Sequence, residues 1–231
     1  MGSIRDQISN YDNRLGLLHC IFCDYGKQNW MFFNFHVTFS ATQTNNDKGL
    51  ITTETGATAT PYDSGAGELS STASMQPGLV YETTETDYLN FLCYYGYNVT
   101  TIKAMSKAFP ENFTCPADSN LDLISTINYP SIGISGFKGN GSKTVTRTVT
   151  NVGEDGEAVY TVSVETPPGF NIQVTPEKLQ FTKDGEKLTY QVIVSATASL
   201  KQDVFGALTW SNAKYKVRSP IVISSESSRT N

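Results

Sequence analysis

Histidine is scarce in this 231-residue chain: His19 and His36 are the only two. A Ser-His-Asp triad needs a histidine that can reach the serine, and both histidines lie in an irregular N-terminal stretch. The G-x-S-x-G turn of many hydrolases is also absent, because Tyr62 and Asp63 precede Ser64 in "YDSGAG". We therefore predict that the chain contains no catalytic residues.

Charged residues and long apolar runs are few as well. Charged residues make up 17% of the chain, its net charge is −5, and its lysines and arginines form no cluster, which argues against nucleic acid as a partner. No apolar run reaches the ~18 residues of a membrane span. The polar start "MGSIRDQISNYDNR" does not resemble a signal peptide. A G-x-G-x-x-G loop is missing, so we expect no dinucleotide cofactor.

The first of two cysteine pairs is Cys20 and Cys23, a C-x-x-C motif beside His19. The spacing of a zinc site is lacking, and so is the βαβ context of a redox motif. We predict no metal site here, and the simpler interpretation is a poorly specified apolar segment.

The second pair, Cys93 and Cys115, lies among glycosylation sequons. The sequons begin at Asn98, Asn112 and Asn140. Sequons around a cysteine pair favour a secreted, oxidising setting, in which a Cys93–Cys115 bridge would close a loop of about 23 residues. The alternative is two free thiols in a reducing compartment. The polar N-terminus is inconsistent with secretion, so the middle of the chain looks secreted while its beginning does not.

Residue patterns divide the chain into segments. Residues 1–40 show neither helical nor strand periodicity, and we expect them to be disordered. Residues 41–118 mix loops with short helices: "TETDYLNFLCYYGY" predicts a helix that begins after Thr86 and ends at Gly96. "VTTIKAMSKAF" predicts a second helix, capped by Thr100 or Thr101, with Ile102, Met105 and Phe109 on its apolar face. Residues 227–231 are a tail.

Residues 119–226 carry the alternation of β-strands. In "SKTVTRTVTNVG" the side chains of Val145, Arg147, Val149 and Asn151 alternate with threonines, and "AVYTVSVE" and "LTYQVIVSA" alternate in the same way. Seven or so short strands separated by turn signals predict a β-sandwich of the fibronectin type III kind. The fold class we expect is mainly β, with this C-terminal sandwich preceded by a small loop and helix region.

Several motifs resemble the plant subtilisin-like serine proteases, or subtilases. "YDSGAGELSSTASMQPGLVYETTETDYLNFLCYYGYN" is similar to the stretch that follows the last helices of their catalytic domain. "NYPSIGIS", "TVTRTVTNVG" and "LTWSNAKYKVRSPIVIS" resemble their C-terminal fibronectin III-like domain. The resemblance covers roughly residues 41–225. It implies that residues 41–118 are the end of a catalytic domain and that the protein is extracellular, in the apoplast.

The family's catalytic motifs are missing from the sequence. The aspartate motif, "GHGTH", the oxyanion-hole asparagine and "GTSM" do not occur, and residues 1–40 do not resemble the family. We hypothesise that residues 1–40 are translated from intron or alternative-start sequence. Full-length transcripts that encode continuous catalytic motifs, with none beginning at Met1, would show that the chain is a gene-model artefact.

Three functions remain open. The first is a non-catalytic C-terminal subtilase fragment whose sandwich packs on, stabilises or dimerises a protease; its partner would be a full-length subtilase, its catalytic domain or a second copy of the chain. The second is a serine endopeptidase, and the third is a free β-sandwich interaction module. Apolar helix faces in residues 41–118 would be partly exposed without a catalytic domain, so we expect residues 120–226 to fold alone more readily than the whole chain.

Overall fold

The computed structural model describes residues 51–66, 77–106, 109–137, 141–200 and 202–224. The predictions for residues 1–40, for Cys20 and Cys23, for Asn140 and for the tail lie outside the described residues. Among the described helices, none combines the length and the apolar character needed to cross a bilayer.

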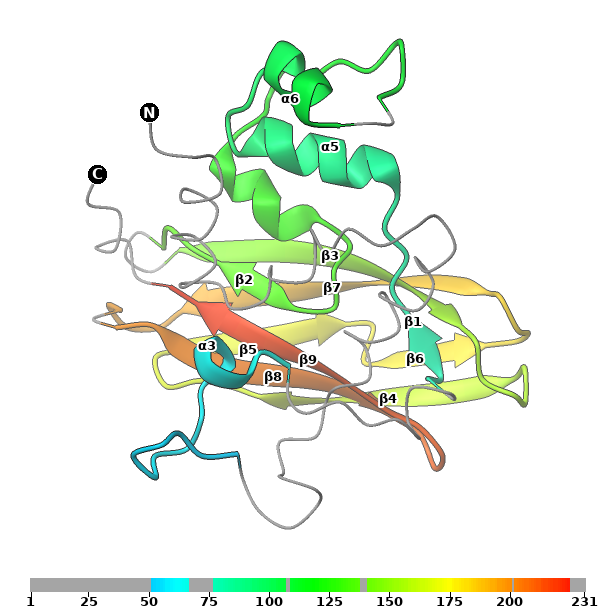
Figure 1. The fold of residues 1–231 in the computed structure, drawn as a ribbon. Coiled ribbons are helices and arrows are strands. Elements are labelled where there is room, and N and C mark those ends of the chain that lie inside the picture. Colours follow the sequence, from blue (N-terminus) through cyan, green and yellow to red (C-terminus); the bar gives the residue numbers. More distant parts are fainter. Residues whose placement is uncertain (1–50, 67–76, 107–108, 138–140, 201, 225–231) are drawn as a thin grey trace.

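Two packed β-sheets form the body of the molecule (Figure 1). One has the strand order β1-β3-β7-β5 and the other β2-β9-β8-β4-β6; the paired strands are antiparallel except β2 and β9, which are parallel. The strands are β1 (Leu79–Val80), β2 (Ile132–Ile134), β3 (Ser142–Asn151), β4 (Ala158–Glu165), β5 (Phe170–Thr175), β6 (Lys178–Phe181), β7 (Lys187–Ala196), β8 (Val204–Ser211) and β9 (Lys216–Ile223). The predicted mainly-β sandwich is confirmed.

The described helices are short and precede most of the sandwich. They are α3 (Pro61–Ser64), α5 (Glu85–Tyr94), α6 (Val99–Met105) and the 3-10 helix η2 (Leu121–Thr126). Figure 1 shows α5 and α6 above the sheet that contains β3 and β7.

Both predicted helix starts are wrong by a few residues. The α5 helix is capped by Thr84 instead of Thr86, because Thr84 lies three residues before Asp87 and the two close a capping box. The α6 helix is capped by Asn98, whose Oδ1 accepts a hydrogen bond from the Thr101 N–H at 2.9 Å. The prediction that Gly96 ends the first helix is confirmed. Gly96 directly follows the C-cap residue Tyr95 and has a φ of 101°.

The α6 helix also ends earlier than predicted. Met105 is its last residue, so Phe109 lies beyond it. Ile102 is fully buried as expected, whereas Met105 is 39% exposed. The apolar face of α6 is therefore narrower than the sequence pattern indicates.

The alternation predicted for the sandwich strands is confirmed. Val145 and Val149 of β3 are fully buried, and Tyr190, Val192 and Val194 of β7 point into the same core. Aromatic rings fill the space between the sheets: Tyr190 and Trp210 meet edge to face at 5.2 Å between ring centroids. This packing of both inner faces is what makes the sandwich stable.

Strand β1 reaches the sandwich from outside the predicted β region. Leu79 and Tyr81 are 0% and 1% exposed and belong to the main core. The Tyr81 hydroxyl lies 2.7 Å from the Tyr190 hydroxyl and 3.1 Å from the Ser219 hydroxyl. Burial raises the pKa of both tyrosines, so they remain neutral hydrogen-bonding groups. A fragment of residues 120–226 would lack this strand; its ability to fold alone stays a prediction, as does the domain division at residues 118 and 119.

Gly78 makes the approach of β1 to the sheet possible. Its φ is +75°, and a Cβ atom there would lie 2.6 Å from Cγ of Tyr215 and 2.7 Å from the Tyr160 hydroxyl. Its carbonyl accepts a hydrogen bond from the Val152 N–H at 2.8 Å. Glycine is therefore required at this position both for the backbone conformation and for the close contact.

We predict that Gly78→Ala destabilises the chain more than Gly56→Ala does. Gly56 has a similar φ of +80°, but a methyl group added there would meet no atom within 4 Å. Strain in the left-handed conformation costs Gly56→Ala at most about 1–2 kcal/mol. Gly78→Ala adds overpacking, for a further cost of about 1–3 kcal/mol. Urea denaturation followed by far-ultraviolet circular dichroism measures the free energy of unfolding of both variants. Equal losses of this free energy would contradict the close contact at Gly78.

Candidate functional site: the helical cap and its junction with the sandwich

Ser64, the one serine that suggests a nucleophile, belongs to a helix end. Its hydroxyl donates to the Thr60 carbonyl at 3.2 Å. The neighbouring Asp63 accepts hydrogen bonds from the backbone N–H and the hydroxyl of Thr60, both at 2.8 Å, and these bonds lower the pKa of its carboxyl group. The described residues include no histidine, since His19 and His36 lie outside them. Asp63 therefore closes the capping box of the short helix α3 with its N-cap residue Thr60, and Ser64 bonds back to the start of the same helix.

The other carboxylates considered from the sequence also stabilise local structure. Glu186 accepts hydrogen bonds from the backbone and hydroxyl of Thr182, which lower the pKa of its carboxyl group, and Asp87 closes the capping box of α5. Across the described part of the chain, no three His, Cys, Asp or Glu residues gather closely enough to hold a metal ion. The Glu186 and Asp87 carboxylates are therefore both engaged in local structure.

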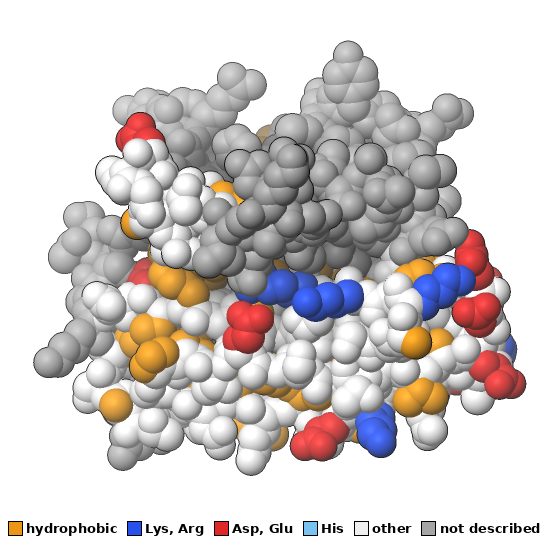
Figure 2. Space-filling view, turned by 90° about the horizontal axis from the view of Figure 1, so that it is seen from below, with side chains coloured by type: hydrophobic (Ala, Val, Ile, Leu, Met, Phe, Trp, Pro, Cys, Tyr) orange, Lys and Arg blue, Asp and Glu red, His pale blue; other side chains and the backbone are white. Residues whose placement is uncertain are grey.

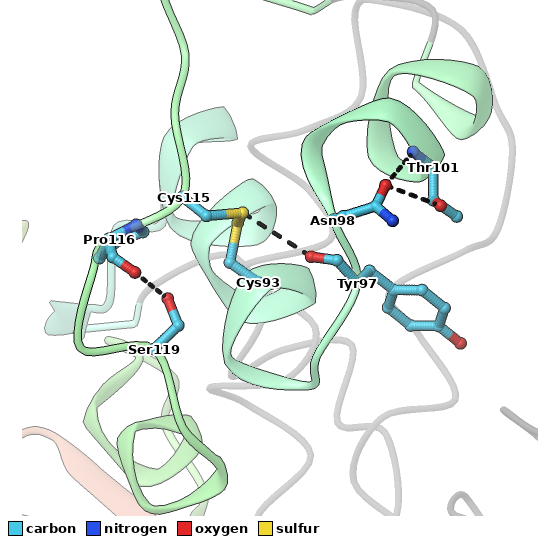
Figure 3. The surroundings of a disulfide bond; sticks show 7 residues. All are labelled: Cys93, Tyr97, Asn98, Thr101, Cys115, Pro116 and Ser119. Carbon is cyan, nitrogen blue, oxygen red and sulfur yellow. Dashed lines mark hydrogen bonds between the residues drawn. A yellow bond between two sulfur atoms is a disulfide. The ribbon is translucent and has the colours of Figure 1, made fainter.

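Residues 85–106 and 109–120 form a compact unit that we call the helical cap. Its small core is made by Leu89, Cys93 and Ile102, with the following side chains packed around them: Leu92, Tyr97, Phe109, Phe113 and Cys115. The predicted Cys93–Cys115 disulfide is confirmed and joins the end of α5 to the loop that leaves the cap (Figure 3). A core this small depends on such a covalent link.

The described sequons lie within the loop that this disulfide closes. Asn98 and Asn112 are both exposed, and Asn98 also caps α6 (Figure 3). Both asparagines are thus accessible at the surface of the helical cap. Their glycosylation stays a prediction.

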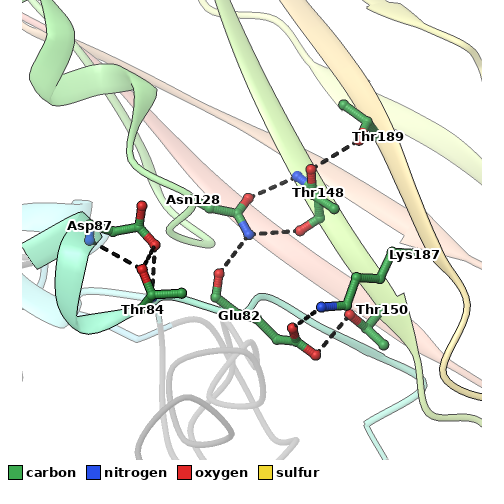
Figure 4. Close-up of polar contacts among 8 residues, drawn as sticks. All are labelled: Glu82, Thr84, Asp87, Asn128, Thr148, Thr150, Lys187 and Thr189. Atoms are coloured by element: carbon green, nitrogen blue, oxygen red, sulfur yellow. Dashed lines mark hydrogen bonds and ion pairs between the residues drawn. The ribbon is translucent and has the colours of Figure 1, made fainter.

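A polar junction fixes the helical cap on strand β3 (Figure 4). The Asn128 side-chain amide donates to the carbonyls of Glu82 and Thr148, each at 2.9 Å, and accepts from the Thr148 N–H at 2.8 Å. The Glu82 carboxylate accepts from the Thr150 hydroxyl at 3.1 Å and pairs with Lys187. The chain that enters the cap and the chain that leaves it are therefore both bonded to the sandwich.

The buried side chain of Arg147 bonds to the chain that returns from the helical cap to the sandwich. It is 2% exposed, and its guanidinium donates to the carbonyls of Tyr129 at 2.7 Å, Ser125 at 2.9 Å and Ser131 at 3.3 Å. Burial lowers the pKa of this group, and the carbonyl dipoles compensate for the lost hydration. The alternation places Arg147 on the inward side of β3, but sequence alone does not indicate these partners.

Helix α3 contacts the other sheet. The Tyr62 ring packs edge to face on Phe205 of β8 at 5.2 Å, and its hydroxyl donates to Asp203 at 2.6 Å. Segments that precede the predicted sandwich thus contact both of its sheets.

Figure 2 shows the molecule from below, where the described Lys and Arg side chains lie among acidic and uncharged groups and form no continuous basic surface.

Comparison with known proteins identifies both the sandwich domain and the family of the chain. A fibronectin type-III domain model matches residues 126–223. Subtilisin-like protease SBT5.1 of Arabidopsis thaliana is 52% identical over 192 residues, which are 81% of this chain and 25% of that protein. The chain belongs to the subtilisin-like protease family. The resemblance predicted from the sequence motifs is thereby confirmed.

Other subtilases align over a similar length. SBT5.3 of Arabidopsis thaliana is 42% identical over 177 residues, covering 76% of this chain and 22% of that protein. Subtilisin-like serine-protease S of Lotus japonicus is 42% identical over 184 residues, which are 79% of this chain and 23% of that protein. The chain thus spans about a quarter of the length of these relatives and corresponds to the C-terminal region of a subtilase. The fibronectin match excludes β1, although Leu79 and Tyr81 lie in the same core.

We predict that replacing Cys93 and Cys115 with serine loosens the helical cap but leaves the sandwich folded. In the chain-entropy model, this loop closure contributes about 3 kcal/mol. Limited proteolysis followed by mass spectrometry should show new cleavage within residues 85–120. Circular dichroism should retain the β signal, because the cap core and the sandwich core are separate. Loss of the β signal together with the cap would contradict this separation.

Proposed function

We propose that the chain is a non-catalytic C-terminal region of a subtilase, whose sandwich stabilises the protease part that it contacts. The observation that carries this proposal is the docking of α3, β1 and the helical cap on the sandwich. Tyr62 contacts Phe205, Tyr81 bonds to Tyr190, and Arg147 bonds to the returning chain. These contacts involve both sheets, so the sandwich and the segments that precede it stabilise each other.

The competing proposal is a serine endopeptidase, as the names of the relatives describe those proteins. Catalysis would need a nucleophile with a base that removes its proton. Ser64 instead donates to a backbone carbonyl, and Asp63 is occupied by Thr60. Loss of triad members leaves only residual catalysis in enzymes of this kind. The described geometry therefore favours the non-catalytic role.

Location and partners follow from the same proposal. The disulfide and the exposed sequons suit the extracellular space, in agreement with the secreted subtilases. The partner we propose is the catalytic domain of a subtilase, with a second copy of this chain and a free-standing interaction module as the alternatives.

One experiment tests both parts of the proposal. The purified chain, the N-terminal portion of the Arabidopsis relative SBT5.1 that precedes the matched region, and a mixture of the two are treated with a fluorophosphonate probe after increasing times at elevated temperature. We expect no labelled serine in the chain alone. We expect the relative's portion to keep its ability to react with the probe for a longer heating time in the mixture, because binding to a folded state stabilises that state.

The controls separate the two parts. A labelled serine that disappears in the Ser64→Ala variant would show that the chain is catalytic. Unchanged survival of labelling in the mixture would contradict the stabilising role. Tyr62→Ala serves as a matched variant, because it removes the α3 contact with Phe205 and should reduce any stabilisation.

A further inference from the structure

Strand β5 is an open edge of the sandwich. It is the last strand in the order β1-β3-β7-β5, and among the described residues only β7 pairs with it. The Thr197 N–H donates to the Gly169 carbonyl at 2.8 Å, which sets the alternation of the β5–β7 ladder. In an antiparallel ladder, every second residue directs its N–H and C=O away from the partner strand. The backbone groups of Ile172 and Val174 therefore point outward from the sheet edge.

The other sheet edges in the described part of the chain are capped, charged or short. At the opposite edge of the same sheet, β1 has two residues, and beside it the Asn128 amide bonds to the N–H and the C=O of Thr148. Carbonyls that flank β2 accept hydrogen bonds from the side chains of Lys143 and Arg147. Strand β6 has four residues and begins with the exposed Lys178. Such devices keep sheet edges from pairing with other chains.

Strand β5 has none of these devices. Its six residues, FNIQVT, include no charged residue, no proline and no glycine. Asn171, Gln173 and Thr175 are exposed on its outer face, and their side chains form no hydrogen bond among the described residues. A neutral edge of this length, with unpaired backbone groups, is a template for pairing with another strand.

We propose that β5 pairs antiparallel with β5 of a second copy of this chain, around a two-fold axis at Gln173. In this register Ile172 of one copy lies opposite Val174 of the other, and each such pair exchanges both of its outward N–H···O=C bonds. Phe170 lies outside the paired segment, because its N–H already donates to the Pro167 carbonyl at 3.3 Å. The contact is isologous, so it closes with two copies and joins their four-stranded sheets into one.

The side chains of the strand are complementary to themselves in this register. On the outer face Gln173 meets its own copy, and Asn171 meets Thr175 of the second copy. These groups are uncharged and carry both donors and acceptors, so they can hydrogen-bond across the strands without repulsion. On the inner face Ile172 meets Val174, which continues the apolar core of the sandwich. Self-complementarity of this kind favours a second copy over an unrelated strand.

The dimer and the protease-stabilising role use different parts of the molecule. Strand β5 lies at the edge opposite to β1, and Tyr62 of α3 contacts the other sheet at Phe205. Pairing through β5 therefore leaves these contacts in place. The inference goes beyond the proposed function, and either can fail without the other.

Disulfide trapping tests the register. Gln173→Cys and Asn171→Cys are each made in the full chain with Cys20→Ser and Cys23→Ser, and are oxidised mildly. Facing Cα atoms in a non-hydrogen-bonded pair lie about 4.5 Å apart, within the range of a disulfide, so Gln173→Cys should give a covalent dimer. Asn171→Cys should stay monomeric, because about 13 Å of strand separates it from its copy. Equal cross-linking of the two variants, or none in Gln173→Cys, would overturn the proposal.

Sedimentation velocity over a range of concentrations measures association without a cross-link. One strand pair is a small interface, so we expect a reversible dimer. Gln173→Lys places two ammonium groups opposite each other and should weaken dimerisation by at least about tenfold. Gln191→Lys is the matched control, because Gln191 is exposed on the same face but belongs to β7, away from the edge. Circular dichroism checks that both variants keep the β signal.

Three outcomes of the sedimentation experiment would overturn the proposal. They are a monomer at every concentration, dimerisation that survives Gln173→Lys, and equal weakening by Gln191→Lys. The probe-labelling experiment on protease stability does not involve the β5 edge, so its failure is distinguishable from failure here.

Discussion

The insertion of strand β1 into the sandwich is the constraint on which the rest of the structure depends. Leu79 and Tyr81 fill the core, and the Tyr81 hydroxyl bonds to Tyr190 and Ser219, one from each sheet. An unpaired buried hydroxyl costs about 1–3 kcal/mol, so this network fixes β1 in a single register. The helical cap then begins at a defined position, because α5 starts a few residues after Tyr81.

The same constraint links structure to the proposed role. A sandwich tethered by a flexible linker would move independently of its neighbours. Here Asn128 bonds the entering chain to β3, Arg147 bonds the returning chain to the core, and Tyr62 contacts the opposite sheet. The sandwich is thereby integrated with the segments that precede it. That integration is what a stabilising region of a protease requires, and it needs no catalytic group of its own.

Local patterns could be predicted from the sequence, whereas contacts distant in the chain could not. The period-two alternation around Val145 is a local signal, and it predicts the inward face of β3 correctly. The Thr84 cap could have been recognised by its spacing to Asp87. Strand β1 is two residues long, too short to show alternation, and its partner β3 lies far along the chain. The partners of Arg147 are backbone carbonyls, which leave no trace in side-chain patterns.

Native-state hydrogen exchange of the full chain tests most directly whether β1 is an integral strand. The Val152 amide donates to the Gly78 carbonyl, so its protection reports the opening of the chain that leads into β1. We predict that this amide opens with the same free energy as the amides of the β3–β7 ladder, because β1 leaves only when the core unfolds. Opening of Val152 at a much lower free energy, with the β3–β7 amides still protected, would show that β1 is a detachable edge and would contradict the account.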